Sequence, residues 1–184
     1  MMEINPAKVW QDRLASALGL DQYQAIMSKA QQVDVSADAA FQQSFNGYYR
    51  IRRNAPWRES YYRLFEHLKH AEQVTFDGIL DALYAQTGNV EASFSSKMLA
   101  TLRPEMPIWD QYVVRNLGLK VPSATDPQRL DQVKALYASL VRWYEEFLTT
   151  DNAKVCLNKF DEMLPDYTWV SDVKKIDSYL WSIR

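Results

Sequence analysis

Two side chains near the middle of the chain have the types that acid–base or covalent chemistry needs: the carboxylate of Asp110 and the amine of Lys97. A carboxylate can stabilise a developing positive charge or activate a water molecule, and an amine can attack a carbon when an apolar pocket keeps it uncharged. Each also has a structural interpretation. Asp110 fits the N-cap of a predicted helix over 111–117, and Lys97 fits a partly buried ion pair with Asp110 or Glu91.

A second group of candidates is the basic passage over 50–58, which interrupts the helical pattern of its neighbours at Gly47 and Pro56. Its arginines alternate with aromatic residues, an arrangement that can contact phosphates and stack a base. The same arrangement is also common as cation–π packing on a protein surface. The arginines are Arg50, Arg52, Arg53 and Arg58, and the candidate stacking rings are Tyr48, Tyr49 and Trp57.

Composition predicts a folded, soluble chain. The 184 residues are 47% hydrophobic and 24% charged, with a net charge of -2, and this length suits a single domain over 1–184. The net charge excludes a global basic field, so nucleic-acid binding would have to rest on a local patch. Most of the aromatic residues, 13% of the chain, are expected to pack between helices.

Metal, disulfide and membrane chemistry are not expected. The single cysteine, Cys156, excludes an intramolecular disulfide, and His67 and His70 have no companions to complete a metal site. We therefore expect no metal and no cofactor. The N-terminal segment has no apolar run typical of a signal peptide or a membrane anchor, so we expect no membrane association and a cytoplasmic location. The oligomeric state is not predicted.

Apolar residues recur at helical spacing along the whole chain, and no alternating strand pattern persists. Capping residues precede many of these segments, including Asn5, Thr75, Asp110, Thr150 or Asp151, and Ser171. The spacing predicts helices over 6–18, 21–33, 36–46, 57–71, 111–117 and 127–148, with further helices on either side of Gly88 and in the last 35 residues. The predicted fold is an all-α, single-domain orthogonal bundle of about nine helices.

The stretch from Leu83 to Leu117 reads as a helix, a break at Thr87-Gly88-Asn89, a second helix with Lys97, a proline-bounded loop, and Asp110 at the start of a third helix. This outline resembles the helix-hairpin-helix DNA glycosylases. The pieces Ser96-Lys97-Met98-Leu99, Pro107-Ile108-Trp109-Asp110 and the C-terminal segment 175–181 look similar to the 8-oxoguanine glycosylase-like subgroup. About a third of the chain takes part in the resemblance.

The resemblance implies a central helix-hairpin-helix-like element whose turn, at Gly88 and Asn89, binds a DNA phosphate through backbone N–H groups. It implies that Asp110, 22 residues after Gly88, stabilises the oxocarbenium-like sugar or activates a water as a base departs. Lys97 departs from the pattern, because the family's lysine would lie about five or six residues earlier, more than one helical turn away. Gly88 alone is equally typical of a helix C-cap.

The function that the resemblance predicts is a DNA glycosylase-like protein that binds duplex DNA, extrudes a nucleotide and cleaves the N-glycosidic bond of a damaged base, with or without lyase activity. Asp110 is the expected catalytic carboxylate, and Lys97 is the second candidate. The alternative is a non-catalytic helical module of the same fold that binds nucleic acid or another protein.

Overall fold

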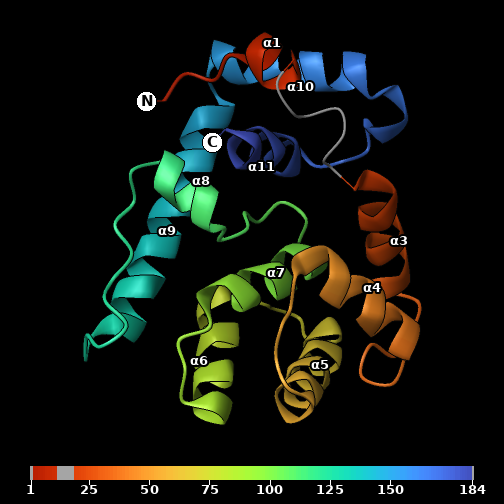
Figure 1. Ribbon diagram of the computed structural model, residues 1–184, viewed down its shortest axis with the longest axis vertical. Helices are drawn as coiled ribbons and strands as arrows, with labels where there is room; N and C mark the ends of the chain where they lie inside the picture. Colours follow the sequence, from red (N-terminus) through yellow and green to blue (C-terminus); the bar gives the residue numbers. More distant parts are fainter. Residues whose placement is uncertain (1, 12–18, 184) are drawn as a thin grey trace. The chain divides into compact units, whose positions relative to one another are not determined.

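A computed structural model describes residues 2–11 and 19–183 of the chain. Within these residues the protein forms ten α-helices and one short 3-10 helix, with no β-strand (Figure 1). The all-α bundle predicted from the sequence is confirmed. The first predicted helix is seen as α1 (Pro6–Val9) with a helical turn continuing over residues 10–11, and residues 12–18 of its predicted span lie outside the described residues.

The chain divides into two compact units. Unit 1 combines Met1–Leu18 with Pro104–Arg184, and unit 2 is the continuous segment Gly19–Arg103 between them. The single domain expected over 1–184 stays a prediction.

Unit 2 consists of five helices with short connections. They are α3 (Leu20–Ala30), α4 (Ala39–Tyr49), α5 (Ala55–Lys69), α6 (Phe76–Thr87) and α7 (Ala92–Leu102). Helix α3 packs on α4 and α7, and α6 packs on both α5 and α7. The four residues 88–91 connect α6 to α7, so two adjacent helices are joined by a tight turn at the place where the sequence predicts one (Figure 1).

The core of unit 2 is aromatic. Phe45, fully buried on α4, lies within ring-contact distance of Phe65 on α5 (5.6 Å) and Tyr49 on its own helix (4.7 Å). The neighbouring rings of Tyr61 and Tyr62 complete this contact between α4 and α5. Burial of such large rings stabilises a fold by several kcal/mol each, so this cluster fixes the two helices that flank the basic passage.

Unit 1 is built from the N-terminal and C-terminal segments of the chain. It contains α1, α8 (Gln111–Asn116), α9 (Arg129–Leu148), α10 (Asp151–Met163), the 3-10 helix η2 (Pro165–Tyr167) and α11 (Asp172–Ser182). Helix α11 packs on α1, α8, α9 and α10. The indole of Trp10 donates to the hydroxyl of Tyr179 (2.8 Å), which in turn donates to the carbonyl of Cys156 (2.9 Å). These buried bonds tie the N-terminal helix to α10 and α11.

Local capping chemistry explains where most helices begin. The side chains of Asn5, Thr75, Asp110, Thr150 and Ser171 each accept a backbone N–H of the first turn, as predicted.

Three predicted boundaries were wrong: the start and the end of α4 and the start of α5. Helix α4 is capped by Asp38, because the amide and hydroxyl of Ser36 bond to the Asp34 carboxylate instead, and α4 continues to residue 49 rather than ending at 46. Helix α5 begins at residue 55, with Asn54 as its cap and Pro56 inside the first turn, where proline's missing N–H costs nothing.

Candidate functional site

Asp110 occupies a fixed position at the junction of a loop and α8. Its backbone is extended (φ -110°, ψ 145°), and its carboxylate accepts the N–H of Tyr112 at 2.8 Å. The two preceding residues, Ile108 and Trp109, are buried, while Asp110 itself is half-buried. The N-cap interpretation is therefore confirmed. Because capping also fixes the orientation of the carboxylate, it is compatible with the predicted catalytic role, which stays a prediction.

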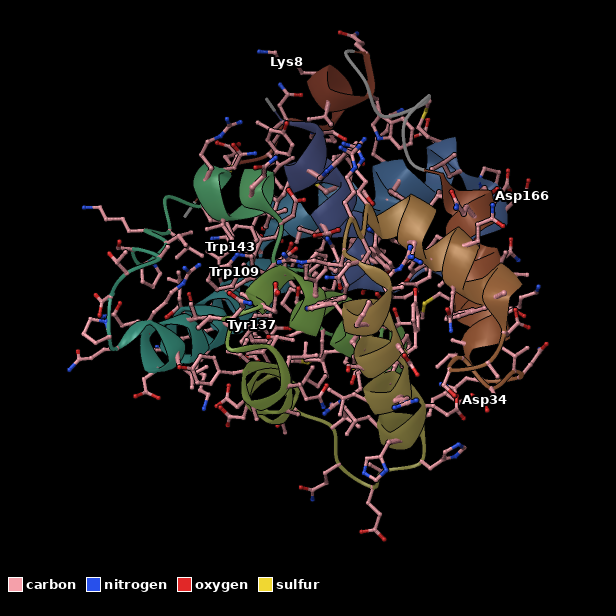
Figure 2. The ribbon with its side chains drawn as sticks, turned by 60° about the horizontal axis from the view of Figure 1, so that its bottom comes forward. Lys8, Asp34, Trp109, Tyr137, Trp143 and Asp166 are labelled. Atoms are coloured by element: carbon pink, nitrogen blue, oxygen red, sulfur yellow. The ribbon has the colours of Figure 1, made fainter. Side chains whose placement is uncertain are left out.

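The loop before Asp110 is anchored to helix α9. The hydroxyl of Tyr137 donates to the carbonyl of Pro107 at 2.8 Å, and this bond is buried. Figure 2 labels Tyr137 and Trp143 on α9 together with Trp109, which directly precedes the aspartate. A long helix thus holds the backbone three residues upstream of Asp110.

A buried polar group lies in the same unit. The hydroxyl of Tyr144 lies 3.4 Å from Oδ1 of Asp177, whose Oδ2 accepts from the Lys174 ammonium at 3.0 Å. Burial raises the pKa of Tyr144 well above its ordinary value, and the negative charges of Asp177 and Asp110 add to this shift, as does Tyr137. Tyr144 is therefore a permanent hydrogen-bond donor within the electrostatic reach of Asp110.

The turn at Gly88 is a helix C-cap. Gly88 has φ 68° and donates its N–H to the carbonyl of Tyr84 at 2.8 Å. The amide of Asn89 donates to Oγ1 of Thr87 (3.1 Å), and its side chain donates to the Thr87 carbonyl (2.9 Å). A Cβ added at Gly88 would meet nothing within 4 Å, so the outer side of the turn is open. Phosphate binding by Gly88 and Asn89 stays a prediction.

Lys97 lies half-buried in the middle of α7. Its ammonium donates to the carbonyl of Tyr49 at 3.0 Å and lies 5.2 Å from the centre of the Phe94 ring. A cation at the last turn of α4 satisfies a carbonyl that the helix leaves without an internal donor. Glu91, one of the two carboxylates expected beside Lys97, binds Arg53. The structure thus gives Lys97 a capping role, and its catalytic role stays a prediction.

The basic passage forms the connection between α4 and α5. Arg50, Arg52 and Arg53 are exposed there, and Arg58 is half-buried on the first turns of α5. Arg53 lies over the rings of Trp57 (5.6 Å) and Phe94 (5.2 Å), as the cation–π interpretation predicts. DNA contact by these arginines stays a prediction.

Arg50 has a strained backbone. Among the described residues it is the one non-glycine residue with positive φ (54°), in the left-handed position that ends α4. The next amide, that of Ile51, donates to the carbonyl of Asn46 at 2.9 Å, which completes the C-terminal motif. Glycine or asparagine is usual at this position, because a Cβ clashes with the following carbonyl.

Substituting Arg50→Gly is expected to raise the free energy of unfolding by about 1 kcal/mol, because it relieves this clash. Urea unfolding followed by circular dichroism measures the change. Arg50→Asn should give an intermediate gain, and Arg50→Ala should give none because alanine keeps the Cβ. A gain in the alanine variant equal to that of glycine would show that the arginine side chain, not its backbone, is the unfavourable element.

The predicted stacking rings pack inside unit 2. Tyr49 is 5% exposed against Phe45, and Tyr48 tilts against Tyr23 with ring centres 6.0 Å apart. Trp57 stacks on Tyr61 (5.0 Å, 16°). A base could stack on Tyr49 only after that ring left the core. Their role in base stacking stays a prediction, while the packing role expected of most aromatic residues accounts for their positions.

The structure brings several candidates together around Phe94. The Phe94 cluster consists of Arg53, Trp57, Tyr61, Phe94 and Lys97, contributed by the α4–α5 connection, α5 and α7. Burial raises the pKa of Tyr61 well above its ordinary value, so its hydroxyl stays protonated and donates to the Phe94 carbonyl at 3.0 Å. The basic passage and the start of α7 therefore belong to one packed cluster, whereas Asp110 belongs to unit 1.

Sequence reasoning named Glu91 only as a possible partner of Lys97 and missed its pairing with Arg53. Its two carboxylate oxygens accept from Arg53 at 2.8 Å each, although the two residues are 38 positions apart. Only the burial of a charged residue at the start of a helix could have pointed to it, and burial is not visible in the sequence.

Among the residues that the structure describes, no group of three or more His, Cys, Asp or Glu side chains is arranged to hold a metal ion. In the same residues, none of the helices combines the length and the apolar character needed to cross a bilayer. In comparisons with known proteins, no family model, no curated protein and no solved structure matches the chain.

Proposed function

We propose that this chain is a DNA glycosylase-like protein, which binds duplex DNA through the α6–α7 turn and the basic passage and uses Asp110 to cleave the N-glycosidic bond of a damaged base. The observation that supports this proposal most is the placement of Asp110. Its carboxylate is fixed by the Tyr112 amide, follows two buried residues and remains half-buried. Fixed orientation and partial removal from water are what a catalytic carboxylate needs.

In the proposed reaction the C1′–N bond breaks, and the bonding electron pair leaves with the base. The sugar becomes oxocarbenium-like, and the Asp110 carboxylate stabilises that positive charge. Water then forms the new bond to C1′ and passes a proton to the carboxylate, which gives it to the nitrogen of the departed base, leaving an abasic site, the free base and an ionised Asp110. No metal or cofactor takes part in this scheme.

Unit 2 supplies the support for DNA binding. The exposed arginines of the α4–α5 connection and the open turn at Gly88 lie in one unit, and the Arg53–Glu91 pair links the connection to α7. Because the net charge of the chain is -2, DNA binding must rest on such a local patch.

A non-catalytic nucleic-acid-binding or protein-binding module of the same fold is the second candidate. It is favoured by the internal bond of the second candidate catalytic group, because the Lys97 ammonium donates to the Tyr49 carbonyl. An amine held in this way gains less from contact with a sugar.

The test separates binding from chemistry. The full chain is incubated with fluorescent duplexes that each contain one damaged base, and abasic sites are detected by alkaline strand cleavage, with binding measured in parallel by anisotropy. The proposal predicts binding together with abasic product on at least one duplex. Binding without product across all duplexes would favour the module, and no binding at all would exclude both nucleic-acid functions.

Lys97 has its own test, borohydride trapping of a Schiff base between the protein and DNA. Because the ammonium already donates to the Tyr49 carbonyl, attack on a sugar would have to break this contact, and we expect no trapped adduct. Lys97→Met should retain base release and lose about 1 kcal/mol of stability with the carbonyl contact. An adduct that forms with the wild-type chain and disappears in Lys97→Met would instead establish the lysine as a nucleophile.

A further inference from the structure

Arg53 is held more firmly than an ordinary surface arginine. Its side chain is 42% exposed, yet Glu91, only 6% exposed, binds it through both carboxylate oxygens at 2.8 Å. The flat guanidinium also lies over the rings of Trp57 and Phe94. A long side chain that normally samples many rotamers therefore has three neighbours that limit its direction.

The contact with Glu91 leaves much of the guanidinium for another acceptor. Both bonds to Glu91 use the Nη2 nitrogen, and a guanidinium has further N–H groups on Nη1 and Nε. These remaining N–H groups point in different directions, so a phosphate oxygen can accept a charge-assisted hydrogen bond from Nη1 or from Nε. Because Arg53 is partly exposed, such an acceptor can approach from solvent.

Glu91 stands at the N-cap position of α7 but makes no side-chain bond to the amides of that helix. Its carboxylate is directed to Arg53 instead, 38 residues away in sequence. A residue that served only to begin α7 would be expected to bond to the helix's own first-turn N–H groups, as Asp38 does in α4.

We propose that Glu91 is a positioning residue, which orients Arg53 for contact with a phosphate of the DNA backbone. This inference rests on the proposed DNA binding and adds the residue that prepares the contact. Loss of a negative charge by itself would strengthen binding to the DNA phosphates. If Glu91 orients Arg53, however, loss of its carboxylate should weaken DNA binding, because the guanidinium is no longer held in place.

The experiment measures anisotropy of a fluorescent duplex bound to the full chain over a series of salt concentrations. Arg53→Ala removes one phosphate contact and should make the negative slope of log K against log salt shallower by about 0.9. Glu91→Ala should also make the slope shallower. The double variant should bind no more weakly than Arg53→Ala, since both changes abolish the same contact between Arg53 and the phosphate.

Two conservative variants separate position from charge. Glu91→Asp keeps the charge but withdraws the carboxylate by one methylene, so it should bind like Glu91→Ala. Glu91→Gln keeps an acceptor at the same reach and should bind at least as tightly as the wild type. If circular dichroism shows that Glu91→Ala is unfolded, the comparison of Glu91→Asp with Glu91→Gln decides the question without it.

The matched control is Glu59→Ala, which removes a carboxylate from an exposed ion pair with Arg63 on α5 of the same unit. It should leave the slope unchanged. Glu91 variants that all behave like this control, with wild-type DNA binding intact, would overturn the positioning role and leave the proposed function standing. A wild-type chain without salt-dependent binding would overturn both.

Discussion

Replacement of Asp110 by asparagine is expected to lower the rate of base release by at least about 100-fold while the chain stays folded. The proposed role requires a negative charge next to the sugar, and asparagine has none. Stability should change by no more than a few tenths of a kcal/mol, because asparagine is as good an N-cap as aspartate and can still accept the Tyr112 amide. Alkaline cleavage of the abasic product under single-turnover conditions measures the rate.

Two further variants make this result interpretable. Asp110→Ser also retains the cap without a carboxylate and should be equally inactive. Asp38→Asn makes the same chemical change at the cap of α4, where the carboxylate accepts the Phe41 amide at 2.7 Å, and should leave base release unchanged. If both Asp110 variants still release the base, Asp110 has no catalytic role and serves only as the N-cap of α8.

Phe45→Ala is expected to lower the free energy of unfolding by about 3 to 5 kcal/mol. The ring is completely buried, and its neighbours come from both α4 and α5, so its removal leaves a cavity between these helices that cannot close without moving one of them. Urea unfolding monitored by circular dichroism gives the free energy of unfolding.

Phe45→Leu should cost less, about 1 kcal/mol, because it refills most of the volume. The exposed control is Tyr84→Ala on α6, whose ring is 43% exposed and whose loss should change stability by about 0.5 kcal/mol or less. A loss in Phe45→Ala no larger than in the Tyr84 variant would mean that the aromatic cluster does not hold unit 2 together.

The helices could be predicted from local chemistry, because both their apolar spacing and their caps are contained in short segments. Thr75, Thr150 and Ser171 each have the residue type and position of a cap and act as caps. One error arose where two suitable residues compete: Ser36 and Asp38 are both good caps, and only the bonds of Ser36 to Asp34 decide between them. Such choices depend on turns that sequence patterns do not specify.

The surroundings of the candidate residues could not be predicted in the same way. Lys97 and the Tyr49 carbonyl are 48 positions apart, and Arg53 and Glu91 are 38 apart, so packing of whole helices creates both contacts. The sequence identified the residue types, and the capping of α8 by Asp110 follows from them. The division of the candidates between two units was invisible, since no composition change marks residues 18–19 or 103–104.

The discontinuous make-up of unit 1 has a consequence for synthesis on the ribosome. Residues 19–103 form a compact unit from one continuous stretch, so this unit can fold as soon as that stretch has left the exit tunnel. The N-terminal helix must wait longer, because Ile4 bonds with Asn152 and Trp10 with Tyr179. A nascent chain halted once residue 103 has emerged from the tunnel, but before residue 152 has, should therefore protect its middle from protease while its first ten residues remain cleavable.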